Sequence, residues 1–231
     1  MLLAGGASSR MGRDKASFAV GGETLAARAA RRLLAVCPQV VAADAGRGLL
    51  PNLPSLPDGP GQGPAAGILG AARAWPGHPL LVLACDLPQV PAALLELLVR
   101  AAIFPPPDGA GGESAARAAP ASAGAGEPGP AEVRAPADWV VPRWQRGLEP
   151  LCALYLPAAL AALAAAVERG TRWAAALHRL AEIESLNVLY LEGDCLQRFG
   201  DPEGLFLNLN TPLELERWLE SERAGGGQKE I

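Results

Sequence analysis

The sequence predicts an α/β fold in which helices cover both faces of a doubly wound, mostly parallel sheet. The first observation is the alternation of short apolar runs with longer segments of helical apolar spacing. The second is the run Pro79–Cys85 (PLLVLAC), which is continuously apolar, as in a parallel strand covered on both faces. A chain of 231 residues is long enough for one such domain with a sizeable core. We therefore expect residues 1–231 to form a single domain.

The individual elements follow from the same patterns, taken in chain order. Strands are expected where short apolar runs lie between turn signals, at 1–4, 39–43, 79–85, 138–141, 151–156, the end of 184–191, and 206–210. Helices are expected where apolar residues recur with helical spacing, at 24–36, 65–75, 91–102, 157–169, 173–181 and 212–219. Residues 51–67 are rich in proline and glycine, which predicts a loop. Thr211 is placed to cap the last helix, with Pro212 in its first turn and Glu214 strengthening its start.

Two segments do not fit the alternation. Residues 104–137 consist mainly of Pro, Gly, Ala and Ser, and Val133 is their single branched aliphatic residue. Such a composition cannot build a packed core, so we expect a low-complexity, disordered insertion. Residues 224–231 are expected to form a flexible tail.

Composition and charge exclude several classes of protein. The net charge of −4 disfavours a nucleic-acid platform, which usually carries a basic excess. No apolar run approaches the roughly 18–20 residues of a membrane span, and no secretory signal precedes the first motif. The four cysteines form no CxxC pair and only two histidines exist, so free thiols are expected rather than a zinc site. A cytoplasmic protein is therefore expected.

The opening stretch MLLAGGASSRMGRDK has the composition of a phosphate cradle. Gly5 and Gly6 allow the backbone to approach phosphate oxygens closely, and Arg10 and Lys15 add two positive charges. The alternative is a glycine-rich turn with solvated cations. Two better-known loops are disfavoured, because the opening stretch matches neither GxxxxGK[ST] nor GxGxxG.

Polar residues downstream suggest a metal site. Asp86 follows a buried strand, and a carboxylate at the carboxyl end of a parallel strand suits Mg²⁺; the alternative is a cap for the next helix. Asn208 and Asn210 would face the same side of a strand, where they could hold a metal, pyrophosphate or an acceptor phosphate. Their alternative role is turn and cap chemistry before Pro212.

Several motifs carry a family resemblance. LAGGASSRMGRDK resembles the LAGGxSxRMGxDK signature of the molybdenum cofactor guanylyltransferases (MobA family), which belong to the nucleotidyltransferases with a Rossmann-like fold. Four further stretches resemble later family motifs in the same order: LPDGPGQGPAAG, LACDLP, GLEPLCALY and FLNLNTP. The chain departs from the family pattern in three places. It has Ala43-Asp44 where the family often has Asn, GPAAG instead of GPLAG, and the long segment 104–137.

The resemblance implies transfer of GMP from GTP to the phosphate of molybdopterin, with release of pyrophosphate and Mg²⁺ as the cofactor. It implies catalytic roles for Arg10, Lys15 and Asp86, metal binding by Asp86 and Asn210, and acceptor binding by Asn208 and Asn210. The nucleotide-binding residues that it implies are Leu3, Ala4, Gly5, Gly6, Lys15, Asp58 and Asp86. Asp58 could accept hydrogen bonds from both N1–H and N2–H₂ of guanine, and its alternative role is that of a solvated loop acid.

The expected partners are GTP and a molybdopterin-type cofactor, with molybdenum-insertion proteins or target-enzyme chaperones as further candidates, and a monomer is expected. Two other functions stay open. One is nucleotidyl transfer to another phosphorylated acceptor, including cytidylyl transfer to molybdenum cofactor or transfer to a sugar, isoprenoid, corrinoid or deazaflavin precursor. The other is a non-catalytic nucleotide-binding protein.

Overall fold

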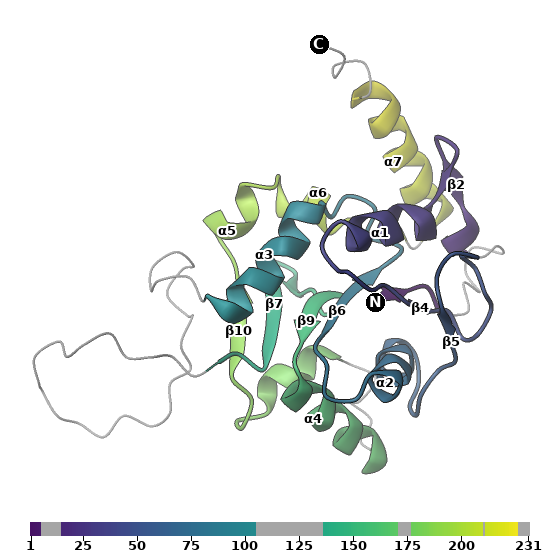
Figure 1. Ribbon diagram of the computed structural model, residues 1–231. Coiled ribbons are helices and arrows are strands. Elements are labelled where there is room, and N and C mark those ends of the chain that lie inside the picture. Colours follow the sequence, from purple (N-terminus) through teal and green to yellow (C-terminus); the bar gives the residue numbers. More distant parts are fainter. Residues whose placement is uncertain (6–14, 105–135, 171–176, 210, 226–231) are drawn as a thin grey trace, which may run out of the picture.

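The computed structural model describes residues 1–5, 15–104, 136–170, 177–209 and 211–225 (Figure 1). The expected insertion at 104–137 therefore lies outside the described residues except at its two ends. The expected tail at 224–231 begins within a helix that continues to Gly225, and its last six residues lie outside the described part.

A central sheet has the strand order β10-β7-β9-β6-β1-β4-β5. Its strands are β1 (Leu2–Leu3), β4 (Ala42–Ala43), β5 (Ser55–Leu56), β6 (Leu80–Ala84), β7 (Trp139–Trp144), β9 (Cys152–Tyr155) and β10 (Val188–Leu191). Strand β8 (Gly147–Leu148) pairs with β7, and β2 (Ala19–Val20) forms a separate hairpin with β3 (Glu23–Thr24).

The sheet is mostly parallel. Strand β9 is antiparallel to both of its neighbours, β6 and β7, whereas the pairs β10–β7, β6–β1, β1–β4 and β4–β5 are parallel. All strands of this order except β9 therefore end at one edge of the sheet. Ligands of open α/β sheets bind outside this carboxyl edge.

Helices cover both faces of the sheet, which confirms the predicted doubly wound α/β architecture. Helices α1 (Leu25–Leu34) and α3 (Ala92–Ile103) lie over one face, and α2 (Pro64–Ala74) and α4 (Pro157–Glu168) over the other (Figure 1). The remaining helical segments are α5 (Asp194–Gln197), α6 (Pro202–Leu205), α7 (Pro212–Gly225) and the 3₁₀ turns Lys15–Ser17 and Leu177–Glu182.

The helix caps follow from local sequence. At the start of α1, Thr24 Oγ1 accepts a hydrogen bond from Ala27 N at 3.1 Å. At the start of α7, Thr211 N donates to Glu214 Oε2 (2.8 Å) and Glu214 N donates to Thr211 Oγ1 (3.2 Å). This reciprocal pair is a capping box, so the predicted start of the last helix is confirmed.

Two predicted elements are wrong. Residues 51–67 do not form one loop, because they include β5 and the first turns of α2. The expected strand at 206–210 is absent from its described residues, 206–209. The amides of Phe206 and Leu207 donate to Pro202 and Gly204 in the preceding helical turn, so they are not available to a strand ladder. Consequently, the argument that Asn208 and Asn210 share one face of a strand fails.

The core is built from the buried faces of the sheet and of α1 to α4. Trp139 and Tyr155, on the paired strands β7 and β9, are fully buried with ring centroids 5.5 Å apart. A second, smaller cluster joins α7 to the rest of the molecule through Leu25, Leu209, Leu215 and Trp218. This cluster holds the segment before α7 against α1.

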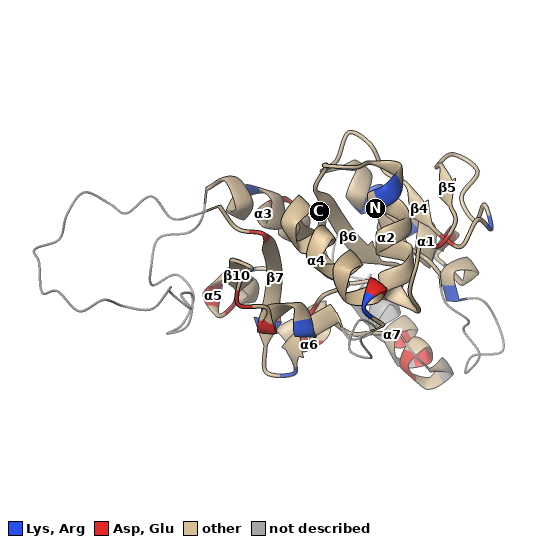
Figure 2. Cartoon of the chain, turned by 90° about the horizontal axis from the view of Figure 1, so that it is seen from below, with Lys and Arg blue, Asp and Glu red and all other residues tan. Residues whose placement is uncertain are grey.

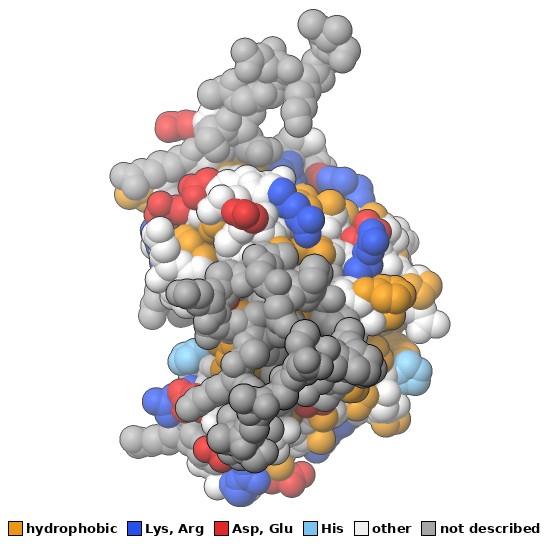
Figure 3. Space-filling model, turned by 90° about the vertical axis from the view of Figure 1, so that its left-hand side faces the viewer, with side chains coloured by type: hydrophobic (Ala, Val, Ile, Leu, Met, Phe, Trp, Pro, Cys, Tyr) orange, Lys and Arg blue, Asp and Glu red, His pale blue; other side chains and the backbone are white. Residues whose placement is uncertain are grey.

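Charged side chains are dispersed over the molecule. Acidic residues lie along α7, and basic residues are scattered among acidic ones on other elements (Figure 2). On the side of the molecule that Figure 3 shows, charged and apolar side chains are intermingled where atoms are described. In the described part of the chain, none of the helices combines the length and apolar character that crossing a membrane requires.

Candidate functional site

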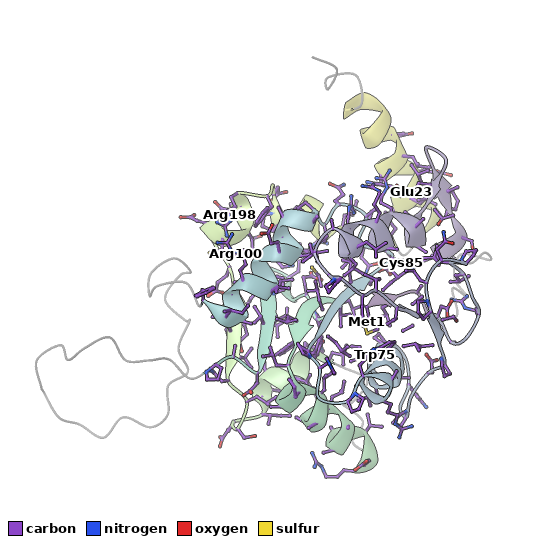
Figure 4. All side chains as sticks on the ribbon, viewed as in Figure 1. Met1, Glu23, Trp75, Cys85, Arg100 and Arg198 are labelled. Carbon is purple, nitrogen blue, oxygen red and sulfur yellow. The ribbon has the colours of Figure 1, made fainter. Side chains whose placement is uncertain are left out.

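The carboxyl edge of the sheet brings Lys15 and Asp86 together. Asp86 follows β6, and Lys15 opens the 3₁₀ turn that precedes the β2–β3 hairpin. Lys15 Nζ lies 3.8 Å from Asp86 Oδ2, and the two side chains are only 16% and 19% exposed. Figure 4 marks Cys85, the residue before Asp86, and Met1, the residue before β1. Two residues that the sequence motifs singled out separately, Lys15 and Asp86, therefore lie side by side.

The second oxygen of Asp86, Oδ1, is buried and has no hydrogen-bond partner among the described residues. Burial raises the pKa of Asp86, and the positive charge of Lys15 opposes that rise. The N-cap position of α3 is taken by Pro91, so Asp86 does not stand at the cap of that helix. An unpaired buried carboxylate oxygen is costly unless a ligand satisfies it.

Asn208 lies next to Asp86. Leu209 N donates to the backbone carbonyl of Asp86 at 3.1 Å, which fixes the preceding residue beside the end of β6. Asn208 Oδ1 is also buried without a partner in the described part of the chain. Since Thr211 and Glu214 form the cap of α7, the cap role considered for Asn208 is not needed there.

These two unpartnered oxygens fit a divalent cation. Carboxylate and amide oxygens are ligands that Mg²⁺ prefers, and Mg²⁺ commonly takes one or two carboxylates from the protein. Within the described ranges, no three His, Cys, Asp or Glu side chains are grouped so as to hold a metal ion. Asp86 and Asn208 could therefore hold such an ion together with groups of a bound substrate.

Glu149 is a neighbour of Asp86 that sequence reasoning did not select. Burial raises the pKa of Glu149, the hydrogen bond from Trp144 Nε1 to its Oε1 (2.7 Å) opposes the rise, and the charge of Asp86 adds to it. The antiparallel register of β6 and β9 pairs Leu83 with Cys152, which brings the residues before β9 to the site edge. In the sequence, the one sign that Glu149 could belong to the site was its place directly before Pro150 in the motif GLEPLCALY.

A second group of predicted residues gathers where β1 ends. Ala4 N donates to Ala43 O (3.0 Å), and Cys85 N donates to Leu3 O (3.0 Å), so β1 is held on both sides. A Cβ on Gly5 would lie 3.4 Å from Ala43 O and 3.8 Å from Asp58 Oδ1. The carboxylate of Asp58 therefore lies beside Gly5, and Asp58 is exposed to solvent.

Two glycines fix the loop that carries Asp58. A Cβ on Gly59 would lie 2.5 Å from Gly70 N, and a Cβ on Gly70 would lie 2.4 Å from Pro57 O. Gly59 N also donates to Ala66 O at 2.7 Å. The loop thus contacts α2 backbone to backbone, which any larger residue would prevent.

Asp44 points into the protein, although it stands where the related sequences often have Asn. It is fully buried, and it accepts hydrogen bonds from Ser55 Oγ (2.5 Å) and Leu49 N (2.8 Å). Burial acts to raise the pKa of Asp44, but these hydrogen bonds and the nearby Arg47 together lower it. Asp44 therefore holds the loop after β4 as an ionised, satisfied group.

The structure thus assembles two neighbouring groups at one edge. Lys15, Asp86 and Asn208 form the first, and Leu3, Ala4, Gly5 and Asp58 form the second. Three further predicted site residues, Gly6, Arg10 and Asn210, lie outside the described residues.

Known proteins show the same sequence pattern. A family model described as "MobA-like NTP transferase domain" matches residues 1–183. A probable molybdenum cofactor guanylyltransferase of Natronomonas pharaonis is 30% identical over 229 residues, covering 94% of both chains. Two further matches are partial. The molybdenum cofactor guanylyltransferase of Rhodobacter capsulatus is 42% identical over a stretch that covers 44% of this chain and 57% of that protein. A bifunctional molybdenum cofactor biosynthesis protein of Synechocystis is 36% identical over a stretch that covers 43% of this chain and 30% of that protein.

Solved structures show the same fold. The molybdopterin-guanine dinucleotide biosynthesis protein A of Archaeoglobus fulgidus superposes with a TM-score of 0.66 at 24% identity, covering 96% of this chain and 97% of that one. The match to the family model spans well over half of the sequence and includes Lys15, Asp58 and Asp86. The chain therefore belongs to the MobA-like NTP transferase family and is a nucleotidyltransferase.

Proposed function

We propose that this protein transfers GMP from GTP to the phosphate of molybdenum cofactor (molybdopterin), releasing pyrophosphate and forming the guanine dinucleotide cofactor. The observation that carries the proposal is the pairing of Lys15 with Asp86 beside the buried, unpartnered oxygen of Asn208. The names of the full-length relatives support molybdenum cofactor as the acceptor and guanylyl as the transferred group.

In this reaction, a phosphate oxygen of the acceptor attacks the α-phosphorus of GTP. The bond from the α-phosphorus to the bridging oxygen of the β-phosphate breaks, and its electron pair leaves with pyrophosphate. An ionised phosphate is already a nucleophile at neutral pH, so no strong general base is needed. The protein contributes alignment and charge neutralisation, as in other phosphoryl-group chemistry.

Lys15 has the position to neutralise charge on the leaving group. Its ammonium lies at the edge where β1 and β6 end, and it is mostly buried, so its charge acts in a medium that screens poorly. We assign Arg10 the same role from its place in the opening motif, although it lies outside the described residues. Positive charge here would stabilise the pyrophosphate as it departs.

Asp86 and Asn208 would hold Mg²⁺, and Asn210 is the further ligand that the sequence resemblance suggests. Bound there, the ion would supply charge neutralisation to the phosphate oxygens of the nucleotide. Asp86 keeps Oδ1 unpartnered while Lys15 lies near Oδ2, so one carboxylate can serve both the cation and the ammonium. Asn208 and Asn210 are also our candidates for contact with the acceptor phosphate.

The nucleotide base would lie over the end of β1. Backbone groups of Leu3, Ala4 and Gly5 would contact base and ribose, with Gly6 continuing the same stretch. The Asp58 carboxylate would accept from N1–H and N2–H₂ of guanine, since it lies over Gly5 at the end of β5.

We also infer that residues 1–231 act as one domain, because α7 packs through Trp218 and Leu215 against Leu25 of α1. We propose a monomer, as expected from the sequence. The four free cysteines fit a reducing compartment such as the cytoplasm. Molybdenum-insertion proteins and target-enzyme chaperones are the partners that this function suggests.

The test is identification of the product by mass. Purified protein is incubated with Mg²⁺, molybdenum cofactor and either GTP or CTP. A guanylylated pterin that forms from GTP supports the proposal. A cytidylylated product, or pyrophosphate release without any pterin product, contradicts it.

A further inference from the structure

The structure assigns a second base-reading residue, Arg47, which we propose donates a hydrogen bond to O6 of guanine and so selects GTP over ATP and CTP. This inference rests on the proposed function, because it concerns the same nucleotide site. Arg47 belongs to the turn after β4 and was not among the residues that the sequence motifs indicated.

The first step is the position of the guanidinium. Arg47 Nε donates to the backbone carbonyl of Asp44 at 2.8 Å, and Arg47 Nη2 donates to the backbone carbonyl of Ala4. Two bonds to backbone atoms fix both the place and the plane of the group. They hold it at the end of β1, directly before Gly5.

The second step is the position of Asp58 relative to this cation. Asp58 Oδ1 lies 3.8 Å from where a Cβ on Gly5 would be, and Gly5 follows Ala4 in the chain. The turn that carries Arg47 is tied to β5 by the bond from Gly46 N to Leu56 O at 2.9 Å. A rigid donor and an exposed carboxylate therefore border the same two residues, Ala4 and Gly5.

The third step is the chemistry of the bases. The Watson–Crick edge of guanine presents an acceptor, O6, beside two donors, N1–H and N2–H₂. Arg47 supplies donors only, and an ionised Asp58 supplies acceptors only, so together they match this edge. Adenine and cytosine present an amino donor beside a ring-nitrogen acceptor, which would place donor against donor and acceptor against acceptor. The pair therefore favours guanine over adenine and cytosine.

The fourth step explains why this chain uses arginine here. Asp44, which could otherwise contact the base, is buried and engaged by Ser55 and Leu49. The backbone carbonyl of Asp44 accepts the hydrogen bond from Arg47 Nε. The polar contact that this strand end offers to a base thus comes from Arg47.

The experiment measures equilibrium binding of three nucleotides to the full-length protein and to Arg47→Met. GTP and ITP both carry O6, whereas 2-aminopurine riboside triphosphate lacks it. We expect Arg47→Met to weaken GTP and ITP by the same factor, about 10- to 150-fold for a hydrogen bond from a charged donor. The Kd of the 2-aminopurine nucleotide should change by no more than about twofold on this substitution, because this nucleotide has no O6 for Arg47 to contact.

Arg73→Met is the matched control, since Arg73 is an exposed arginine on α2, away from the strand ends. It should bind all three nucleotides as the unsubstituted protein does. If Arg47→Met weakens all three nucleotides equally, Arg47 has only a structural role and the inference is wrong. Unchanged GTP binding by Arg47→Met overturns it as well.

Failure of the proposed function gives a different result from failure of this inference. If the proposed function is wrong, the unsubstituted protein forms no guanylylated pterin in the product assay, whatever the binding data show for Arg47. A protein that binds GTP through Arg47 yet uses another acceptor would retain this inference and lose the proposed acceptor.

Discussion

Lys15 Nζ and Asp86 Oδ2 lie 3.8 Å apart, although the two residues are 71 positions apart in the sequence. Asp86 directly follows β6, and Lys15 opens the 3₁₀ turn that contacts α1, so both side chains lie at the carboxyl edge of the sheet. Each group has a separate task in the proposed reaction, and each is mostly buried. Both should therefore be sensitive to substitution in the turnover assay without being required for folding.

Lys15→Met and Asp86→Asn should each lower kcat by about 10²–10³, the usual loss when one electrostatic contact to developing charge is removed. Guanylyl transfer measured by pyrophosphate release checks this. The control variants are Arg179→Met and Glu96→Gln, which alter exposed groups on other elements and should keep full activity. Near-normal rates in both site variants would show that the site lies elsewhere.

Asn208→Leu should raise the Mg²⁺ concentration needed for half-maximal activity, because it removes one of the two unpartnered oxygens. The shift should be about tenfold or more, the usual scale for groups that tune metal affinity. The measurement is activity as a function of Mg²⁺ at saturating GTP. The control is Asn52→Leu, at an exposed loop position. If Asn208→Leu needs the same Mg²⁺ concentration as the unsubstituted protein, the metal role of Asn208 is contradicted.

Ser55→Ala should destabilise the protein at neutral pH by about 1.5–3 kcal/mol, the range for a hydrogen bond to a charged group. The pKa of Asp44 is lowered in the folded state, so its contribution to stability is present above the ordinary carboxyl range. That contribution is lost as pH falls through the lowered pKa. Urea unfolding between about pH 7 and about pH 2 should therefore show the difference narrowing with acid.

The control for this measurement is Ser185→Ala, since Ser185 is exposed. It should change the free energy of unfolding by less than about 0.5 kcal/mol at every pH. A difference between Ser55→Ala and the unsubstituted protein that does not vary with pH would show that Asp44 is not the group involved.

Gly70→Ala should displace the loop that carries Asp58, because the added Cβ would lie 2.4 Å from Pro57 O. We expect a higher KM for GTP, by about tenfold or more, with a smaller change in kcat. Steady-state kinetics with GTP as the varied substrate measures this. Gly204→Ala is the comparison, since its Cβ would meet only Gln89 Oε1 at 3.7 Å, an ordinary contact.

Trp218→Ala should lower the free energy of unfolding by about 3–5 kcal/mol, as for other buried aromatic truncations. It should also reduce activity, because Leu209 packs in the same cluster and donates to the carbonyl of Asp86. Chemical unfolding and turnover are measured on the same samples. Trp218→Phe, which keeps most of the apolar volume, should lose less in both, and full activity in folded Trp218→Ala would show that the cluster does not support the site.

The sequence was sufficient to predict the residues that follow regular, buried elements. Asp86 comes after a continuous apolar run, so both the strand and the place of its end could be predicted. Thr211 and Glu214 stand at capping-box spacing, which depends only on local contacts. In both cases the local structure follows from interactions among residues that are neighbours in the sequence.

Residues that depend on contacts distant in the chain could not be found in this way. Arg47 reaches Ala4 across 43 positions, and Glu149 comes near Asp86 only because β9 is antiparallel to β6. The expected strand at 206–210 failed for a similar reason, since Leu207 and Leu209 pack with residues of α1 and α7, while the amides of Phe206 and Leu207 donate to the preceding helical turn. The hydrophobic pattern alone does not distinguish a strand from an irregular segment whose apolar side chains are buried.

Helix α3 ends at Ile103 and strand β7 begins at Trp139, and both of these points lie at the amino ends of the parallel strands (Figure 1). The long connection between them is thus attached on the side of the sheet opposite the one that carries Lys15 and Asp86. Reporter groups, affinity handles or whole accessory modules spliced into this connection would be anchored at the edge of the sheet that lies away from Lys15 and Asp86.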